Sequence, residues 1–282
     1  MSVYEAGDPS QPKVVLLHGA MYDEARFSWD QLFPYLAGDY HLFAIDTPRH
    51  GKSRPWKGLL NPNRLNEIIH ATMSHLGLER FSIVGLSMGG ALAIEYASRF
   101  PDQVVSMVLL EPGGLGDKVD FGFFIWLYTK IPGLSRYFTK RYIKKDRQQM
   151  LKLLESIYVK GTQPIDPHRL VSILRDEITG KYENAESDMD DWQLNAIGPF
   201  KLKWSLLDRI PLIQCPTLWL RGIESTLVKQ HEMERALSLV RSGGSQATLK
   251  VFENAGHLLP LEQPMLINAE VKAFLDQTAE RR

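Results

Sequence analysis

The stretch that decides the fold is Gly85-Leu86-Ser87-Met88-Gly89-Gly90, which follows the apolar run 81–84 and precedes the largely apolar residues 91–97. A serine between glycines at this spacing, after a buried strand and before a helix, is typical of a sharp turn that projects a nucleophilic hydroxyl. The glycines remove side chains that would collide across such a bend. The helix that follows directs its amino terminus at the site and favours a developing oxyanion. We therefore predict that Ser87 is a nucleophile.

Further short, largely apolar runs lie on either side of this turn. They cover residues 14–17, 42–45, 104–110, 217–220 and 248–252. Runs of this kind are typical of strands that are covered on both faces, as in a parallel sheet. Several of them end next to Gly, Asp, Glu or His, and ligands bind at the carboxyl edge of such sheets. The sequence therefore predicts an α/β protein with its site at that edge.

Composition narrows the function classes. The chain has 282 residues, with 33 Lys+Arg balancing 33 Asp+Glu, and 44% of its residues are hydrophobic. This length suggests one large domain with an insertion. Zero net charge argues against a nucleic-acid binder, which needs a basic surplus to displace counterions. No apolar run approaches the roughly 18 residues that span a bilayer.

The amino-terminal residues indicate the cellular compartment, and the single cysteine limits which disulfide and zinc sites the chain can form. Residues 1–8 show neither the basic nor the apolar region of a signal peptide, so we expect a cytoplasmic protein. One cysteine, Cys215, excludes an intramolecular disulfide framework and a cysteine-rich zinc site. Because Cys215 precedes Pro216 and has no base nearby, we interpret it as a small buried hydrophobe rather than a nucleophile.

The long gap between residues 113 and 207 differs from the rest of the chain. It shows helical periodicities at 137–158 and 170–178 and no convincing strand. It opens with the aromatic stretch Phe121–Tyr128, which we interpret mainly as helix core. One face of such a helix can also wall an apolar pocket over the sheet edge, and Phe124 and Trp126 are then the substrate-binding residues. We predict a core of residues 1–112 and 208–282 and a helical cap of residues 113–207.

An acidic cluster spans residues 186–191 within this predicted cap. Its carboxylates resemble a metal site only superficially. Acidic residues favour the first turn of a helix, so we interpret the cluster as a solvated helix start. We expect no metal.

With these motifs the chain resembles the α/β-hydrolase superfamily, in particular its small lid-bearing esterase-like members. His18-Gly19 is similar to the family's oxyanion loop after the third strand, and residues 46–53 are similar to its Asp-x-Pro-Gly-x-Gly-x-Ser turn, with Arg49 in place of the first glycine. Residues 214–218 are similar to the start of the late strand that carries the usual acid, and Gly256-His257 to the catalytic-histidine loop.

The resemblance implies an α/β-hydrolase fold: a mostly parallel sheet flanked by helices, with a helical cap inserted after the sixth strand. The few residues before Val14 leave little room, so we expect the family's first strand to be missing. The resemblance also implies that His257 is the general base, in the order Ser…acid…His. His257 would take the proton of Ser87 and return it to the leaving group. The backbone N–H groups of Ala20 and Met88 are implied as the oxyanion hole.

The acid departs from the family pattern. After Gly222 the family reads Gly-x-x-Asp, whereas this chain places Ser225 at the acid position and Glu224 one residue earlier. Glu111 ends the run 104–110, next to the predicted nucleophile strand, and some relatives carry their acid there. We favour Glu111 and keep open Glu224 and a site without a carboxylate. All three alternatives leave Ser87 and His257 in place.

We therefore predict a serine hydrolase that cleaves a small to medium carboxylic ester or lactone through an acyl-enzyme on Ser87. Water is the final acceptor, and no metal or organic cofactor is implied. The same apparatus can cleave C–C bonds in diketones or transfer the acyl group elsewhere. Outside enzymes, the displaced acid would suit a degenerate hydrolase that acts as a ligand receptor. Neither a nucleic acid nor a membrane span is expected, and no feature of the sequence indicates an oligomeric state.

Overall fold

The computed structural model describes residues 1–118, 122–159 and 166–280, and these form one seven-stranded sheet in the order β1-β3-β2-β4-β5-β6-β7. The strands are β1 (Val3–Ala6), β2 (Lys13–Leu17), β3 (His41–Ile45), β4 (Phe81–Leu86), β5 (Val104–Leu110), β6 (Thr217–Gly222) and β7 (Ala247–Phe252). All strands except β1 run parallel to their neighbours, and β1 pairs antiparallel with β3 at the edge of the sheet. The prediction of a mostly parallel sheet is therefore confirmed.

The parallel register brings the carboxyl ends of the central strands to one edge. Leu17 of β2 lies opposite Gly85 of β4, and Leu86 of β4 lies opposite Leu110 of β5. The residues that follow these strands therefore meet at that edge. It is also where ligands bind in sheets of this kind.

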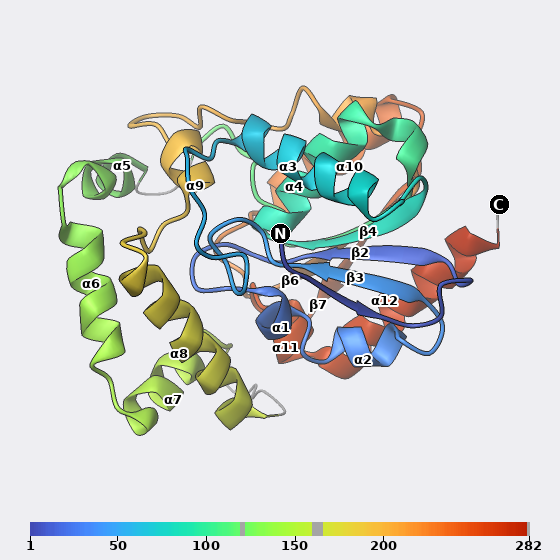
Figure 1. The fold of residues 1–282 in the computed structure, drawn as a ribbon. Coiled ribbons are helices and arrows are strands. Elements are labelled where there is room, and N and C mark those ends of the chain that lie inside the picture. Colours follow the sequence, from blue (N-terminus) through green and yellow to red (C-terminus); the bar gives the residue numbers. More distant parts are fainter. Residues whose placement is uncertain (119–121, 160–165, 281–282) are drawn as a thin grey trace.

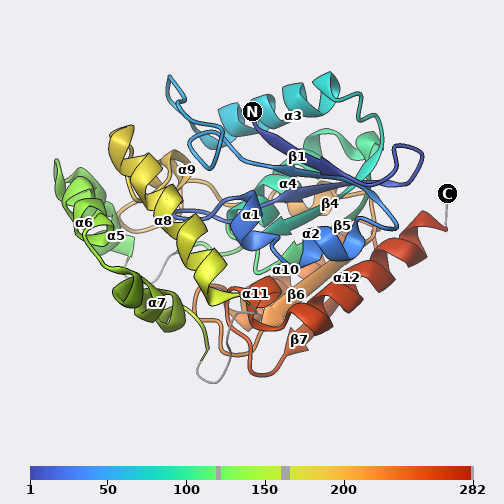
Figure 2. The same cartoon turned by 60° about the horizontal axis from the view of Figure 1, so that its bottom comes forward.

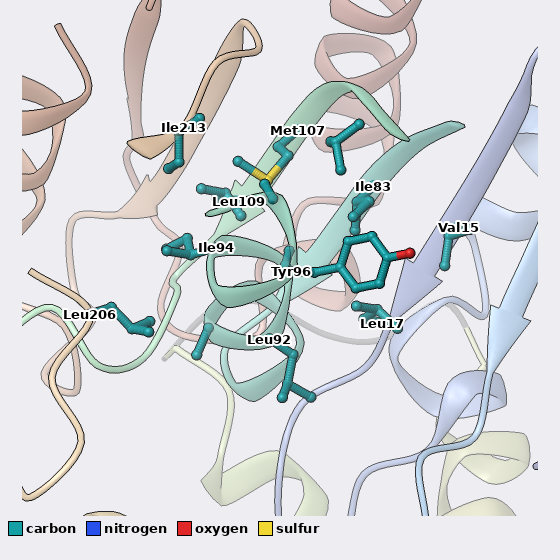
Figure 3. Close-up of a cluster of buried hydrophobic side chains, with 14 of the residues drawn as sticks. Val15, Leu17, Ile83, Leu92, Ile94, Tyr96, Met107, Leu109, Leu206 and Ile213 are labelled. Carbon is teal, nitrogen blue, oxygen red and sulfur yellow. The ribbon is translucent and has the colours of Figure 1, made fainter. Parts of the chain in front are cut away.

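Helices cover both faces of the sheet (Figure 1). On one face lie α3 (Pro62–His75), α4 (Met88–Arg99) and α10 (Gln230–Ser242), and on the other lie α2 (Leu32–Leu36) and α12 (Pro264–Ala279). The strands alternate between these layers, because successive side chains of a strand point to opposite faces. Val15 and Leu17 join the cluster around α4 in Figure 3, whereas Val14 and Leu16 pack with α2 and α12. Shorter elements complete the core: α1 (Ala25–Ser28), α11 (Leu259–Glu262), and the 3-10 turns η1 (Pro101–Gln103) and η2 (Ile210–Leu212).

Between β5 and β6 the chain forms helices beside the carboxyl edge of the sheet (Figures 1 and 2). They are α5 (Gly122–Lys130), α6 (Leu134–Ile143), α7 (Arg147–Ser156), α8 (Pro167–Glu183) and α9 (Asp191–Ala196). α7 and α8 share a separate apolar cluster, to which Phe27 and Leu261 of the remaining chain contribute. If β2 is taken as the family's third strand, β5 is the sixth. The helices between β5 and β6 therefore follow the sixth strand, as the resemblance implied. The cap boundaries 113 and 207 stay a prediction.

The aromatic stretch at the start of this segment differs from its interpretation as helix core. Phe121 lies outside the described residues. All nine residues of α5 are described, and none of them is buried. The core interpretation is wrong because α5 lies at the outer edge of the molecule, where Tyr128 meets Phe138 of α6 with ring centroids 6.0 Å apart.

None of the helices in the described part of the chain combines the length and the apolar character that crossing a membrane requires.

Candidate active site

Ser87 lies in the strand-to-helix turn between β4 and α4. Its backbone has φ 51° and ψ −109°, a conformation that costs a side-chain-bearing residue about 1–3 kcal/mol. The backbone packs so closely around this turn that a side chain at either glycine would collide with it. A Cβ on Gly85 would lie 2.5 Å from the carbonyl oxygen of Gly89, and one on Gly89 would lie 1.9 Å from that of Leu17. The sequence therefore folds here only with glycine on both sides of the serine.

The loop after β2 lies close to this turn, since a Cβ on Gly19 would be 3.7 Å from the Cβ of Ser87. Met88 is the first residue of α4, and Ala20 follows the His18-Gly19 loop after β2. Within the described residues neither the Ala20 nor the Met88 N–H has a hydrogen-bond acceptor. Donors held rigidly without a partner can receive the negative charge of a tetrahedral intermediate.

His18 fixes the loop that carries Ala20. Its ring Nδ1 lies 2.7 Å from the Gly19 carbonyl oxygen, and its Nε2 lies 3.1 Å from both the backbone N and the Oγ1 of Thr47. The Gly19 N–H donates to Asp23 Oδ2 at 2.7 Å. Burial, followed by the nearby His50, holds the pKa of His18 well below its usual value. His18 is therefore a neutral brace of the loop.

Glu111 and His257 approach each other at the same edge. Glu111 directly follows β5 and is fully buried, with a positive φ of 45°. His257 lies in the loop between β7 and α11. Its Nδ1 is 3.6 Å from Glu111 Oε2, which is longer than the expected hydrogen bond of about 3 Å. In enzymes without substrate such contacts are often long and shorten in the reacting complex.

The residue at the family's usual acid position contacts the favoured acid. The Ser225 hydroxyl donates to Glu111 Oε2 at 2.6 Å, and the Gly222 N–H donates to Glu111 Oε1 at 2.8 Å. Both carboxylate oxygens of Glu111 are thereby held in place. A serine at position 225 thus orients a carboxylate that comes from the neighbouring strand.

Glu224, the alternative acid, lies elsewhere. Its side chain is exposed, and its Oε2 accepts the N–H of Ala255 at 3.0 Å. Glu262 accepts the next N–H along the chain, that of Gly256, at 2.6 Å. These two carboxylates fix the loop that carries His257, so Glu224 contacts the backbone of the histidine loop.

Ser87 and His257 open into one cavity of about 260 Å³. Its apolar walls come mainly from α5, α9 and the loops around β5 and β6, and include Ile125, Trp192, Leu202, Trp204 and Val228. Ile125 comes from the predicted aromatic stretch, whereas Phe124 and Trp126 on either side of it are not part of this lining. Lys118, Lys229 and Glu232 contribute charged groups.

Asp190 is a site residue that the sequence interpretation missed. It is buried at the start of α9, and its Oδ2 accepts the N–H of Met21 at 2.6 Å. Its Oδ1 lies 2.7 Å from Lys181 Nζ and 3.2 Å from His50 Nε2. Because Met21 follows Ala20, Asp190 ties α8 and α9 to the candidate oxyanion loop.

Charge balance stabilises this buried network. Burial opposes a charge on His50, but the carboxylate of Asp190 outweighs it and raises the pKa of His50. Burial likewise opposes a charge on Asp190, but His50 and Lys181 lower its pKa overall. His50 and Asp190 therefore each favour the charged form of the other.

The acidic cluster does lie at a helix start, because Asp190 caps α9 and Asp191 lies in its first turn. It is not solvated, however, and that part of the interpretation is wrong. Glu186, Asp188 and Asp190 are all buried. Glu186 pairs with Arg54 at 2.8 Å, and Asp188 accepts hydrogen bonds from Tyr128 and Ser135, both at 2.5 Å. No group of three or more His, Cys, Asp or Glu side chains suited to a metal ion occurs in the described part of the chain.

Cys215 is a buried free thiol, as expected, and burial raises its pKa to about 12. A thiol with so high a pKa is not a nucleophile near neutral pH.

Comparison with protein families gives one match over most of the chain. A family model described as "alpha/beta hydrolase fold" matches residues 12–264. Among solved structures, one entitled "Crystal structure of a membrane phospholipase A, a novel bacterial virulence factor" has a TM-score of 0.75 and 23% sequence identity, covering 98% of this chain and 82% of the other. That likeness shows the fold alone.

Curated relatives carry two different reactions. The chain is 25% identical over 275 residues to the 2-hydroxy-6-oxononadienedioate/2-hydroxy-6-oxononatrienedioate hydrolase of Comamonas testosteroni, covering 93% of this chain and 87% of that protein. It is also 25% identical over 279 residues to the carboxylesterase YbfK of Bacillus subtilis, covering 97% of this chain and 83% of that protein. Sequence identity therefore does not separate ester from C–C hydrolysis.

Proposed function

The chain belongs to the α/β-hydrolase family, and from this premise we propose that it is a serine hydrolase of carboxylic esters or lactones. The observation that carries the proposal is the juxtaposition at one sheet edge. Ser87 and His257 line one cavity, and Glu111 Oε2 lies 3.6 Å from Nδ1 of His257. A nucleophile, a base beside it and a carboxylate that orients the base are the groups that serine-dependent acyl transfer uses.

Acylation begins at Ser87 and His257. Ser87 Oγ attacks the carbonyl carbon of the ester while His257 takes the hydroxyl proton. The oxygen of the tetrahedral intermediate then accepts hydrogen bonds from the N–H groups of Ala20 and Met88, each worth about 3 kcal/mol of the barrier. The C–O bond to the alcohol breaks, and the alcohol leaves with the proton from His257. The acyl group stays on Ser87.

Deacylation repeats the sequence with water as the nucleophile. His257 takes a proton from water, and the oxygen attacks the acyl carbon through a second tetrahedral intermediate. The bond to Ser87 breaks, Ser87 regains its proton from His257, and the carboxylic acid leaves. Glu111 stabilises the imidazolium in both halves, and Ser225 keeps Glu111 in place. These steps use only protein groups and water.

Cavity size and lining support a small to medium substrate with an apolar portion. A volume of about 260 Å³ lies just below the usual range for small-molecule sites, about 300–1,000 Å³. Ile125, Trp192 and Trp204 offer apolar walls to the acyl or alcohol group. We propose that residues 113–207 form the cap, and that Ile125 rather than Phe124 or Trp126 contacts the substrate. A cytoplasmic location stays a prediction.

The test combines labelling with a substrate panel. A fluorophosphonate should label wild type on Ser87 and should not label Ser87→Ala. p-Nitrophenyl esters graded by acyl chain length should be hydrolysed by wild type, with a preference for chains that the cavity accommodates. Activity of Ser87→Ala close to wild type would refute the nucleophile assignment. Labelling of Ser87 without turnover of any ester would favour the degenerate receptor instead.

A second candidate is C–C hydrolysis, favoured by the relative from Comamonas testosteroni. A vinylogous 1,5-diketone such as a 2-hydroxy-6-oxo-dienoate distinguishes the two reactions. Ester hydrolysis as the native activity predicts a kcat/KM for p-nitrophenyl esters well above that for the diketone. The reverse ranking would assign C–C hydrolysis to the same Ser87 and His257.

A further inference from the structure

One segment of the chain is both basic and aromatic. Residues 122–145, here called the basic-aromatic segment, hold six Lys and Arg and no Asp or Glu. The cations are Lys130, Arg136, Lys140, Arg141, Lys144 and Lys145. In a chain whose net charge is zero, this is a local surplus that the whole-chain composition conceals.

Several of its large apolar side chains face solvent rather than the core. Six of them are exposed: Phe123, Phe124, Leu127, Ile131, Tyr137 and Phe138. Phe124 is 67% exposed, and Phe200, which stacks on Phe123 with ring centroids 6.0 Å apart, is 76% exposed. In α5 no residue is buried, and in α6 only Thr139 is.

Figures 1 and 2 place α5 and α6 at the outer edge of the molecule, with α8 between α6 and the sheet. Cations and aromatic rings lie close together within the segment. The guanidinium of Arg141 lies 6.0 Å from the ring centroid of Tyr137, and Tyr137 and Phe138 lie edge to face. The exposed surface of the segment, here called its outer face, therefore carries both apolar and positively charged side chains.

We propose that the basic-aromatic segment docks the protein on an anionic lipid surface. A surface helix that exposes aromatic and aliphatic residues beside Lys and Arg can lie in the membrane interface, with its apolar side chains below the headgroups. Anionic headgroups attract each nearby cation. Phe124 and its neighbours thereby leave water while the cations remain at headgroup level.

A second copy of the chain fits this face less well. A symmetric dimer through residues 122–145 would set the cations of one copy against those of the other. Like charges in contact disfavour association, and the segment has no carboxylate to pair with them. The charge of the face is complementary to an anionic membrane.

Docking on this face would also bring the cavity close to the lipid. Ile125 of α5 lines the cavity that contains Ser87, while Phe124 beside it faces solvent. The docking proposal itself does not depend on the proposed hydrolysis, because its readout is binding.

Co-sedimentation of the full chain with vesicles tests the proposal. Wild type and Ser87→Ala should sediment equally with vesicles of equimolar phosphatidylglycerol and phosphatidylcholine, and neither with phosphatidylcholine alone. Added salt should weaken binding, because screening shortens the reach of surface charges. Lys140→Gln with Arg141→Gln should lower the partition constant about fivefold for each cation removed. Phe124→Ser should lower it at least about tenfold.

Matched controls lie outside the segment. Met265→Ser changes a 72% exposed side chain at the start of α12, and Arg80→Gln removes an exposed cation before β4, at the opposite end of the sheet. Both should bind vesicles like wild type. Absence of binding to anionic vesicles at low salt, or equal losses in the control variants, would overturn the proposal. A dimer in solution that Phe124→Ser converts to monomer would assign the face to a second copy.

Discussion

Replacing the buried carboxylate of Glu111 by an amide tests how the candidate site orients its histidine. In Glu111→Gln the side chain keeps its shape and can still accept the Gly222 N–H through its carbonyl oxygen. Its NH₂ group would then point to Ser225 and to His257 Nδ1, where wild type has a carboxylate oxygen. An NH₂ at that place favours an unprotonated Nδ1, so the proton moves to Nε2 and the ring can no longer accept the proton of the nucleophile.

The distance sets the size of the effect. A carboxylate 3.6 Å from an imidazolium contributes about 4.6 kcal/mol at an effective dielectric constant of about 20. At about 1.4 kcal/mol for each factor of ten, kcat should fall by roughly three orders of magnitude. KM should change little, because the imidazolium forms only after proton transfer.

Steady-state hydrolysis of a p-nitrophenyl ester measures both constants, with Glu224→Gln as the matched control. Glu224 accepts a backbone N–H, which a glutamine oxygen can also accept, so its kcat should stay within a few-fold of wild type. Melting temperatures show whether either variant is misfolded. A Glu111→Gln enzyme with near wild-type kcat, or a larger loss in Glu224→Gln, would refute the assignment of the acid.

Three further predictions rest on other contacts. Gly89→Ala should destabilise the fold by about 3 kcal/mol or more, since its Cβ would lie 1.9 Å from a carbonyl oxygen, and an unchanged Tm would contradict this. The raised pKa of His50 should make the unfolding free energy fall as pH rises above about 6.5, and urea unfolding of Asp190→Asn, which removes its main anionic partner, should show this fall lost. Ile125→Ala should shift selectivity towards longer acyl chains on the ester panel, because Ile125 lines the cavity. Phe124→Ala should leave the selectivity unchanged, because Phe124 is not part of that lining.

Local sequence pattern was sufficient for six of the seven described strands and for the turn that carries Ser87. Each predicted strand lies within about two residues of its observed bounds, because continuous apolar runs and Gly-x-Ser-x-Gly are local signals. β1 was missed, since Val3–Ala6 is short, half-buried and interrupted by the exposed Glu5. A short edge strand of this kind has too few apolar residues to be recognised without its partner β3.

Sequence alone left the acid open, because the choice depends on contacts between distant segments. Glu111 reaches the histidine loop with a positive φ, and its partner Ser225 lies 114 residues away. The signal that could have favoured it was the hydroxyl at the usual acid position, which can donate to a carboxylate from the next strand. Likewise the partners of Asp190 lie on the loops after β2 and β3 and on α8, so its burial could not be read from an acidic run.

The most direct test of the central claim is to trap the covalent intermediate. An acid quench of wild type during turnover of a p-nitrophenyl ester, followed by peptide mass mapping, should show the acyl mass on the peptide that contains Ser87. His257→Ala and Ser87→Ala should show no such adduct under the same conditions. An acyl group on another residue, or steady turnover by Ser87→Ala, would contradict the proposal that Ser87 is the nucleophile of this hydrolase.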